Sequence, residues 1–249
     1  MLKEINEQEF GVSDVLAKTW SVYCKQFKLI TAMLMTLFLP SVMMNSIIVE
    51  QGGKLDSKNA VLLFVFIMIG MVLSSTVMLG VALVVENTVK TDENRMNWKT
   101  VLRKAFSRLG SYIGTSLLAS LILFGLSLLL VIPGIIWTLY YVFFMQVVVL
   151  RGIGGKAALD YSKSLVEGRW WKVFWILFVI SLIYIAMSFG LGFVSFLLPE
   201  VIRMIFGICM YVIVFGFYIV ATTILFLNLD YTSKKNRNET IELDGRAEM

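Results

Sequence analysis

The sequence predicts an all-α integral membrane protein with six transmembrane helices, and three observations carry that prediction. Hydrophobic residues make up 58% of the 249-residue chain, above the roughly 45–50% of ordinary soluble domains. Several uncharged apolar segments exceed the ~18 residues that mark a bilayer span. Basic residues gather in the polar stretches between these segments. A chain with this pattern has too much apolar surface to bury in one water-soluble core.

The predicted spans are separated by polar or proline-containing segments. Pro40 lies inside the first span, where we expect a kink. We expect Pro133–Gly134 to break the helix between the third and fourth spans, and Pro199–Glu200 to form a tight hairpin between the fifth and sixth. One membrane domain, residues 1–231, precedes a polar tail, residues 232–249, that we expect to be disordered. The six spans cover approximately residues 29–49, 60–85, 109–132, 135–150, 173–198 and 204–227.

The basic residues predict the orientation of these spans. With six crossings, 19 Lys and Arg residues fall on one side of the membrane, whereas Lys54, Lys58 and Arg203 fall on the other. The positive-inside rule then places both termini in the cytoplasm and the chain in the cytoplasmic membrane. Orientation also explains the net charge of +5, so nucleic acid is not an expected partner.

Cytoplasmic segments before the first, third and fifth spans can each be written as an amphipathic helix. In residues 97–109, Trp98 and Phe106 share a face with Val, Leu and Ala, and basic residues occupy the opposite face. This pattern is typical of helices lying on anionic headgroups, which makes the lipid bilayer the expected partner. The pattern also predicts three repeats of a surface helix plus a transmembrane hairpin, although juxtamembrane segments are often amphipathic without any repeat. The residues expected at the lipid surface are Trp98, Lys99, Arg103, Lys104, Arg108, Arg169, Trp170 and Trp171.

The sequence offers little for catalysis or metal binding. Histidine is absent, and Cys24 and Cys209 are too few for a disulfide framework or a thiolate metal site. We therefore expect no enzyme, no metal and no cofactor. The charged residues Glu86, Arg151 and Asp230 fall at span ends and are interpreted as interfacial anchors.

Neutral polar residues inside the spans allow two interpretations. Interhelical hydrogen bonds explain most of them. The alternative is an intramembrane polar path for a transported solute or lipid, formed by Gln146, Ser74, Ser75 and Thr76.

A pattern around the fourth span resembles a known family. It consists of Pro133–Gly134, the run Val147–Val148–Val149–Leu150, and then Ala158, Ser162, Leu165, Gly168 and Trp171. These residues resemble the membrane domain that precedes the catalytic domain in some glycerophosphodiester phosphodiesterases, and the related YciC-like bacterial membrane proteins. Arg151 and Gln146 depart from that pattern, where an acidic residue and a proline are common. The resemblance implies an architecture and an association with membrane-lipid or envelope processes, not phosphodiesterase activity.

Three functional hypotheses follow from the sequence. The first is a non-enzymatic protein that acts by association with lipid or with a membrane-protein partner. The second is a passive or partner-driven transporter or lipid-moving protein that uses the polar path. The third is an immunity protein that protects its host against a membrane-active peptide.

Overall fold

The structure is a computed structural model that describes residues 5, 9–36, 57–91, 97–129 and 131–247. Every regular element within these residues is helical, which confirms the all-α prediction. Five helical stretches are long and apolar enough to cross a membrane, and all five predicted spans from the second to the sixth overlap them. The first predicted span lies largely outside the described residues, as does Pro40; α3 (Phe27–Met35) covers its beginning. The five stretches are Ala60–Thr91, Trp98–Leu128, Pro133–Arg151, Trp170–Phe196 and Phe206–Asn236.

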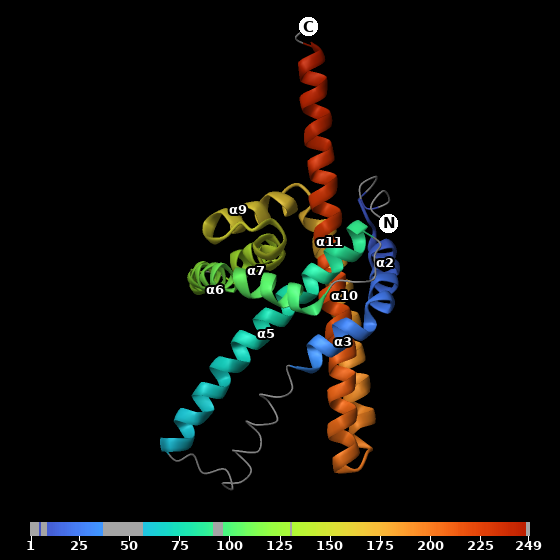
Figure 1. Ribbon diagram of the computed structural model, residues 1–249. Helices are drawn as coiled ribbons and strands as arrows, with labels where there is room; N and C mark the ends of the chain where they lie inside the picture. The colour runs from blue at the N-terminus through green and yellow to red at the C-terminus, as the bar shows by residue number, and fades with distance from the viewer. Residues whose placement is uncertain (1–4, 6–8, 37–56, 92–96, 130, 248–249) are drawn as a thin grey trace.

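The long helices pack together at one end and point in different directions at the other (Figure 1). Helix α10 (Trp170–Phe196) lies against α11 (Glu200–Ala247), while α5 (Ser57–Thr91) leaves the centre at a slant. Along α5, large side chains are exposed from Val61 to Leu73, whereas those from Val77 to Val89 are buried. Exposed apolar residues of this kind suit contact with lipid, since hydrocarbon is their preferred solvent.

The remaining helices surround the packed end. Helix α6 (Trp98–Leu129) is followed by α7 (Val131–Tyr140), and both contact α9 (Gly155–Val166). Helix α2 (Val12–Lys25) lies beside α11, close to the N-terminus (Figure 1). The core therefore joins α2 to the middle of α11.

Asn228 of α11 fastens the N-terminal segment to the core. Its side-chain oxygen accepts a hydrogen bond from the Phe10 backbone N–H at 2.9 Å, and its amide nitrogen donates to the Ile5 carbonyl at 2.9 Å. All three residues are buried. One side chain thus satisfies two backbone groups that could not otherwise be buried without cost.

The fourth span differs from its predicted form. The third and fourth spans are separate helices as predicted, because α6 ends at Leu129 and α7 begins at Val131, and Pro133 lies in the first turn of α7, where a missing N–H is tolerated. A second interruption, which was not predicted, falls inside the fourth span at residues 141–143, before α8 (Phe144–Gln146) and the π-helical turn η1 (Val147–Arg151). The Ser162 hydroxyl accepts a hydrogen bond from the Phe143 N–H at 3.1 Å and donates to the Tyr140 carbonyl at 2.8 Å. A side chain from α9 therefore satisfies the backbone groups freed by the break.

The apolar faces predicted for α9 and α2 are buried only in part; by helical spacing they consist of Ile153, Ala157, Tyr161 and Leu165, and of Val12, Leu16, Trp20, Tyr23 and Phe27. Helix α9 buries Leu165 as expected, but Ala157 is exposed, and Ser162 is buried because its hydroxyl bonds to the broken span. Helix α2 buries Tyr23 as expected, but it also buries Val15, Thr19 and Val22, and Trp20 is exposed. Hydrophobicity alone does not identify a buried face when a polar residue on that face has a hydrogen-bond partner inside the protein.

The polar C-terminal residues are helical where we expected disorder. Helix α11 continues to Ala247, well past the predicted end of the membrane domain (Figure 1). The segment contains several good helix formers and no proline, and it extends a helix that already exists. Extension avoids the nucleation cost that an isolated polar segment would face.

Candidate functional site

A buried ionic cluster joins three parts of the chain that are distant in sequence. The Arg151 guanidinium donates to Asp230 Oδ2 through Nη2 at 2.6 Å and through Nε at 3.1 Å. Its Nη1 donates to Glu86 Oε1 at 2.6 Å. The side chains of Asp230, Glu86 and Arg151 are 0%, 8% and 13% exposed. Because α5, η1 and α11 each contribute one charge, Arg151 fixes these three elements at one point.

Further groups complete the cluster. The Tyr161 hydroxyl of α9 donates to the second Asp230 oxygen. Lys90 pairs with Glu86, and Lys234 with Asp230, each at 2.9 Å and one helical turn apart. Both lysines are about half exposed, so the cluster reaches the protein surface through them. We define the Arg151 cluster as Glu86, Lys90, Arg151, Tyr161, Asp230 and Lys234.

Aromatic rings and a glycine turn hold Arg151 in place. Its guanidinium carbon lies 5.6 Å from the ring centres of both Phe226 and Tyr231, within cation–π range. Gly152 follows with φ at +74°, a conformation that favours glycine. Arg108 donates from Nη1 to the Gly152 carbonyl at 3.3 Å, and a Cβ on Gly152 would lie 2.5 Å from that same nitrogen. Glycine is therefore needed both for the turn and for the approach of Arg108.

Two more glycines build the turn that follows Arg151. Gly155 also has positive φ, at +63°, and its N–H donates to Thr115 Oγ1 of α6 at 2.7 Å. A Cβ on Gly154 would collide with the Ser111 hydroxyl. The glycine-rich segment thus packs a close turn against α6.

A second ionic group lies at the start of α10. Glu9 accepts from Arg169 Nη1 at 2.5 Å and from Lys172 Nζ at 2.8 Å. Burial alone would raise the pKa of Glu9, but the hydrogen bond from Lys172 and the charges of Arg169 and Lys172 outweigh it and lower that pKa. Glu9 is therefore ionised at neutral pH and connects the segment before α2 to α10.

The residues expected at the lipid surface separate into two groups. At the start of α6, Lys99, Arg103 and Lys104 are exposed, as is Trp98 at 55%. The second group contacts other parts of the protein: Arg108 donates a hydrogen bond to Gly152, Arg169 pairs with Glu9, and Trp170 stacks on Phe174. Trp171, next to Trp170, is 67% exposed.

The residues of the predicted polar path lie in different surroundings. The Ser74 and Thr76 hydroxyls donate to carbonyls of their own helix, at Met71 and Val72. Gln146 is 3% exposed, and its side-chain oxygen has no hydrogen-bond partner among the residues that the structure describes. Neither of the two cavities described below is lined by Gln146, Ser74, Ser75 or Thr76.

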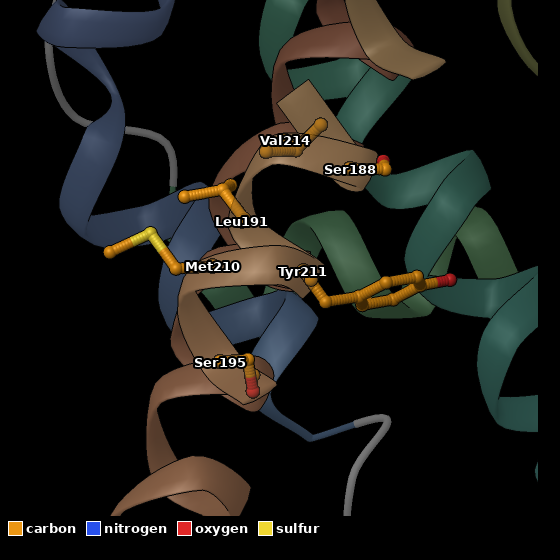
Figure 2. Close-up of a pocket in the computed structure, with 8 residues that line it drawn as sticks. Ser188, Leu191, Ser195, Met210, Tyr211 and Val214 are labelled. Carbon is orange, nitrogen blue, oxygen red and sulfur yellow. The ribbon is translucent and has the colours of Figure 1, made fainter. Parts of the chain in front are cut away.

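The cavities lie along the α10–α11 pair. One, of about 210 Å³, is open and lies between residues 188–195 of α10 and residues 207–214 of α11. In Figure 2, Leu191 and Met210 lie on one side of it and Tyr211 points to the other side. The second, of about 330 Å³, lies nearer the core between α2, α10 and α11. Within the described residues, no group of three or more Cys, Asp and Glu side chains is arranged to hold a metal ion.

The Arg151 cluster was missed by sequence reasoning, which treated its charges as separate anchors. One signal was present: an arginine and two acids end three different spans on the same predicted side of the membrane. Span ends on one side can meet, but the sequence does not show which ones do. Tyr161 gave no signal, since it falls on the apolar face of a surface helix.

No family model, no curated protein and no solved structure matches this chain. Function is therefore inferred from geometry and chemistry alone.

Proposed function

We propose that this chain is a non-enzymatic multi-pass protein of the cytoplasmic membrane that acts by association with anionic lipid. The observation that carries the proposal is that the start of α6 has one buried apolar face and one exposed face with basic and aromatic residues. Val101 and Ala105 are fully buried, which holds the helix against the core. Trp98 and Phe106 are 55% and 63% exposed beside the exposed basic residues. We call Trp98, Lys99, Arg103 and Lys104 the α6 basic surface.

The chemistry of the α6 basic surface suits a lipid headgroup layer. Tryptophan favours the membrane interface, and each nearby Lys or Arg contributes about 1 kcal/mol of attraction to anionic lipid. The buried opposite face means that the helix presents these groups without having to fold on contact. Lipid binding therefore has little ordering cost at this site.

Neutralising the α6 basic surface should remove most of its preference for anionic lipid. In vesicles that contain the K99Q/R103Q/K104Q variant, the several-fold preference for spin-labelled phosphatidylglycerol over phosphatidylcholine is expected to fall close to one. Electron spin resonance measures this ratio from the motionally restricted lipid. The matched control, K25Q/K28Q/K156Q, removes the same charge from exposed lysines elsewhere and should keep the preference. Equal loss in both variants, or no preference in the unmodified protein, would contradict the proposal.

We also propose six spans in three repeats, each with a surface helix and a hairpin, and with both termini in the cytoplasm. The support is the distribution of Lys and Arg, 19 against 3, which five spans would disturb. In a variant without Cys24 and Cys209, single cysteines at Asn59 and Pro199 should react with impermeant thiol reagents from outside intact cells. A cysteine at Lys104 should react only after the membrane is opened. Labelling of all three from the same side would rule out the proposed topology.

A further inference from the structure

An apolar groove runs between α2, α10 and α11. It has a volume of about 330 Å³, at the small end of the range for ligand pockets. Leu16, which also packs against the core, and the exposed Trp20 come from α2. The other walls are formed by Ile183 and Met187 of α10 and by Ile213 and Phe217 of α11.

The lining is almost entirely apolar, and besides the Tyr23 hydroxyl its only side-chain donor is the indole N–H of Trp20. Tyr23 brings the one phenolic hydroxyl in the wall, and that hydroxyl donates to the Ile213 carbonyl at 3.2 Å. Its neighbours are alkyl, thioether or aromatic, and the Trp20 ring packs 6.5 Å from the Phe217 ring. A hydrocarbon chain matches this surface, whereas a headgroup or a polar peptide would lose hydrogen bonds to water without replacement.

The α10 wall connects the groove to a cationic group. Ile183 follows Lys172 by 11 residues, which is three helical turns, so both residues lie on one stripe of α10. The rise over that distance is about 16 Å, close to the ~15 Å of one hydrocarbon leaflet. The Lys172 side chain is 37% exposed beside Glu9 and has donors left for another oxygen. One phospholipid could therefore place its phosphate at Lys172 and a chain in the groove.

We propose that this groove binds one acyl chain of a cytoplasmic-leaflet phospholipid, whose phosphate lies near Lys172 and Arg169. The inference rests on the proposed lipid association but names a different site and a different part of the lipid. The α6 basic surface selects headgroup charge; the groove binds the chain of any phospholipid, because every phospholipid carries the phosphate. Both Ile183 and Ile213 lie within helices long enough to span the bilayer, where acyl chains are the available ligand.

The test uses a phospholipid with a photoactivatable diazirine near the end of one chain. The full-length protein is reconstituted in phosphatidylcholine vesicles with a trace of this lipid, and labelled peptides are mapped by mass spectrometry. Residues 12–25 and 183–187 should be labelled several-fold more per residue than the lipid-exposed reference 189–196. The I183W variant fills the groove and should reduce labelling of residues 12–25 to the reference level. The matched control I185W places the same ring at a 48%-exposed position outside the groove and should leave labelling unchanged.

Two outcomes would overturn the inference. One is labelling of residues 12–25 at or below the reference level in the unmodified protein, which is also the result if a second copy or another protein occupies the groove. The other is equal labelling in I183W and I185W, with matching circular dichroism spectra showing that both variants are folded. The K99Q/R103Q/K104Q variant should keep full groove labelling, so failure of the α6 basic surface and failure of the groove are distinguishable.

Discussion

Replacement of Arg151 by methionine is expected to lower the free energy of unfolding by about 3–5 kcal/mol. The variant leaves the carboxylates of Asp230 and Glu86 buried, at 0% and 8% exposure, without the guanidinium that neutralises both. Lys90 and Lys234 remain beside them, but both are about half exposed and each pairs within its own helix, so neither joins α5 to α11. Titration with sodium dodecyl sulfate in mixed micelles, followed by circular dichroism, measures the change.

Two comparisons isolate the ionic effect in Arg151→Met. Arg103→Met makes the same substitution at an exposed position of α6 and should change stability by less than about 0.5 kcal/mol. Adding Asp230→Asn to Arg151→Met removes one stranded charge and should recover part of the loss. Arg151 does not link α5 to α11 if Arg151→Met is as stable as the unmodified protein. The same holds if adding Asp230→Asn lowers the free energy of unfolding further by as much as Asp230→Asn does alone.

Replacement of Asn228 by leucine is expected to detach the N-terminal segment from α11, with a loss of about 2–4 kcal/mol. Leucine has a similar size but cannot accept from the Phe10 N–H or donate to the Ile5 carbonyl. Those two backbone groups would lose their partners in a buried site, so the segment should leave the core to reach water. Hydrogen exchange of residues 9–25 should increase strongly while α5 and α10 stay protected.

A surface asparagine provides the control for Asn228→Leu. Asn87 of α5 is half-buried and accepts a long hydrogen bond, 3.3 Å, from the nearby Thr91 hydroxyl. Asn87→Leu should leave exchange of residues 9–25 unchanged. Protection of that segment in Asn228→Leu would mean that Asn228 is not what holds it.

The helices were predictable because hydrocarbon length and turn residues are local properties. The hairpin at Pro199–Glu200 and the turn at Gly168, with φ at +80°, both follow from chemistry visible in a few residues. The break in the fourth span was not predictable, because the partner for its free backbone groups, Ser162, lies about 20 residues further along the chain. The break between the third and fourth spans was predictable from Pro133, which lies in the first turn of the helix that follows this break.

Among the sites too, the features that depend on one helix were predictable and those that depend on contacts between helices were not. Exposure of Trp98 and its basic neighbours could be read from helical periodicity, since it depends on one helix alone. The Arg151 cluster depends on where three helices end relative to one another, which composition does not encode. The groove was hidden for a different reason: α2 has two apolar stripes, one against the core and one that contains Trp20, and sequence reasoning assigned only the second.

The order of the Arg151 cluster along the chain has a consequence for biosynthesis. Glu86 and Arg151 are translated well before Asp230, and Asn228, which holds Ile5 and Phe10, comes just before Asp230. A nascent chain that has inserted only its earlier hairpins therefore carries an arginine with half of its partners missing and an undocked amino-terminal helix. The Arg151 cluster can therefore form only after α11 has been made, and products truncated before Asp230 would present unmatched charge that quality-control proteases of the membrane could recognise.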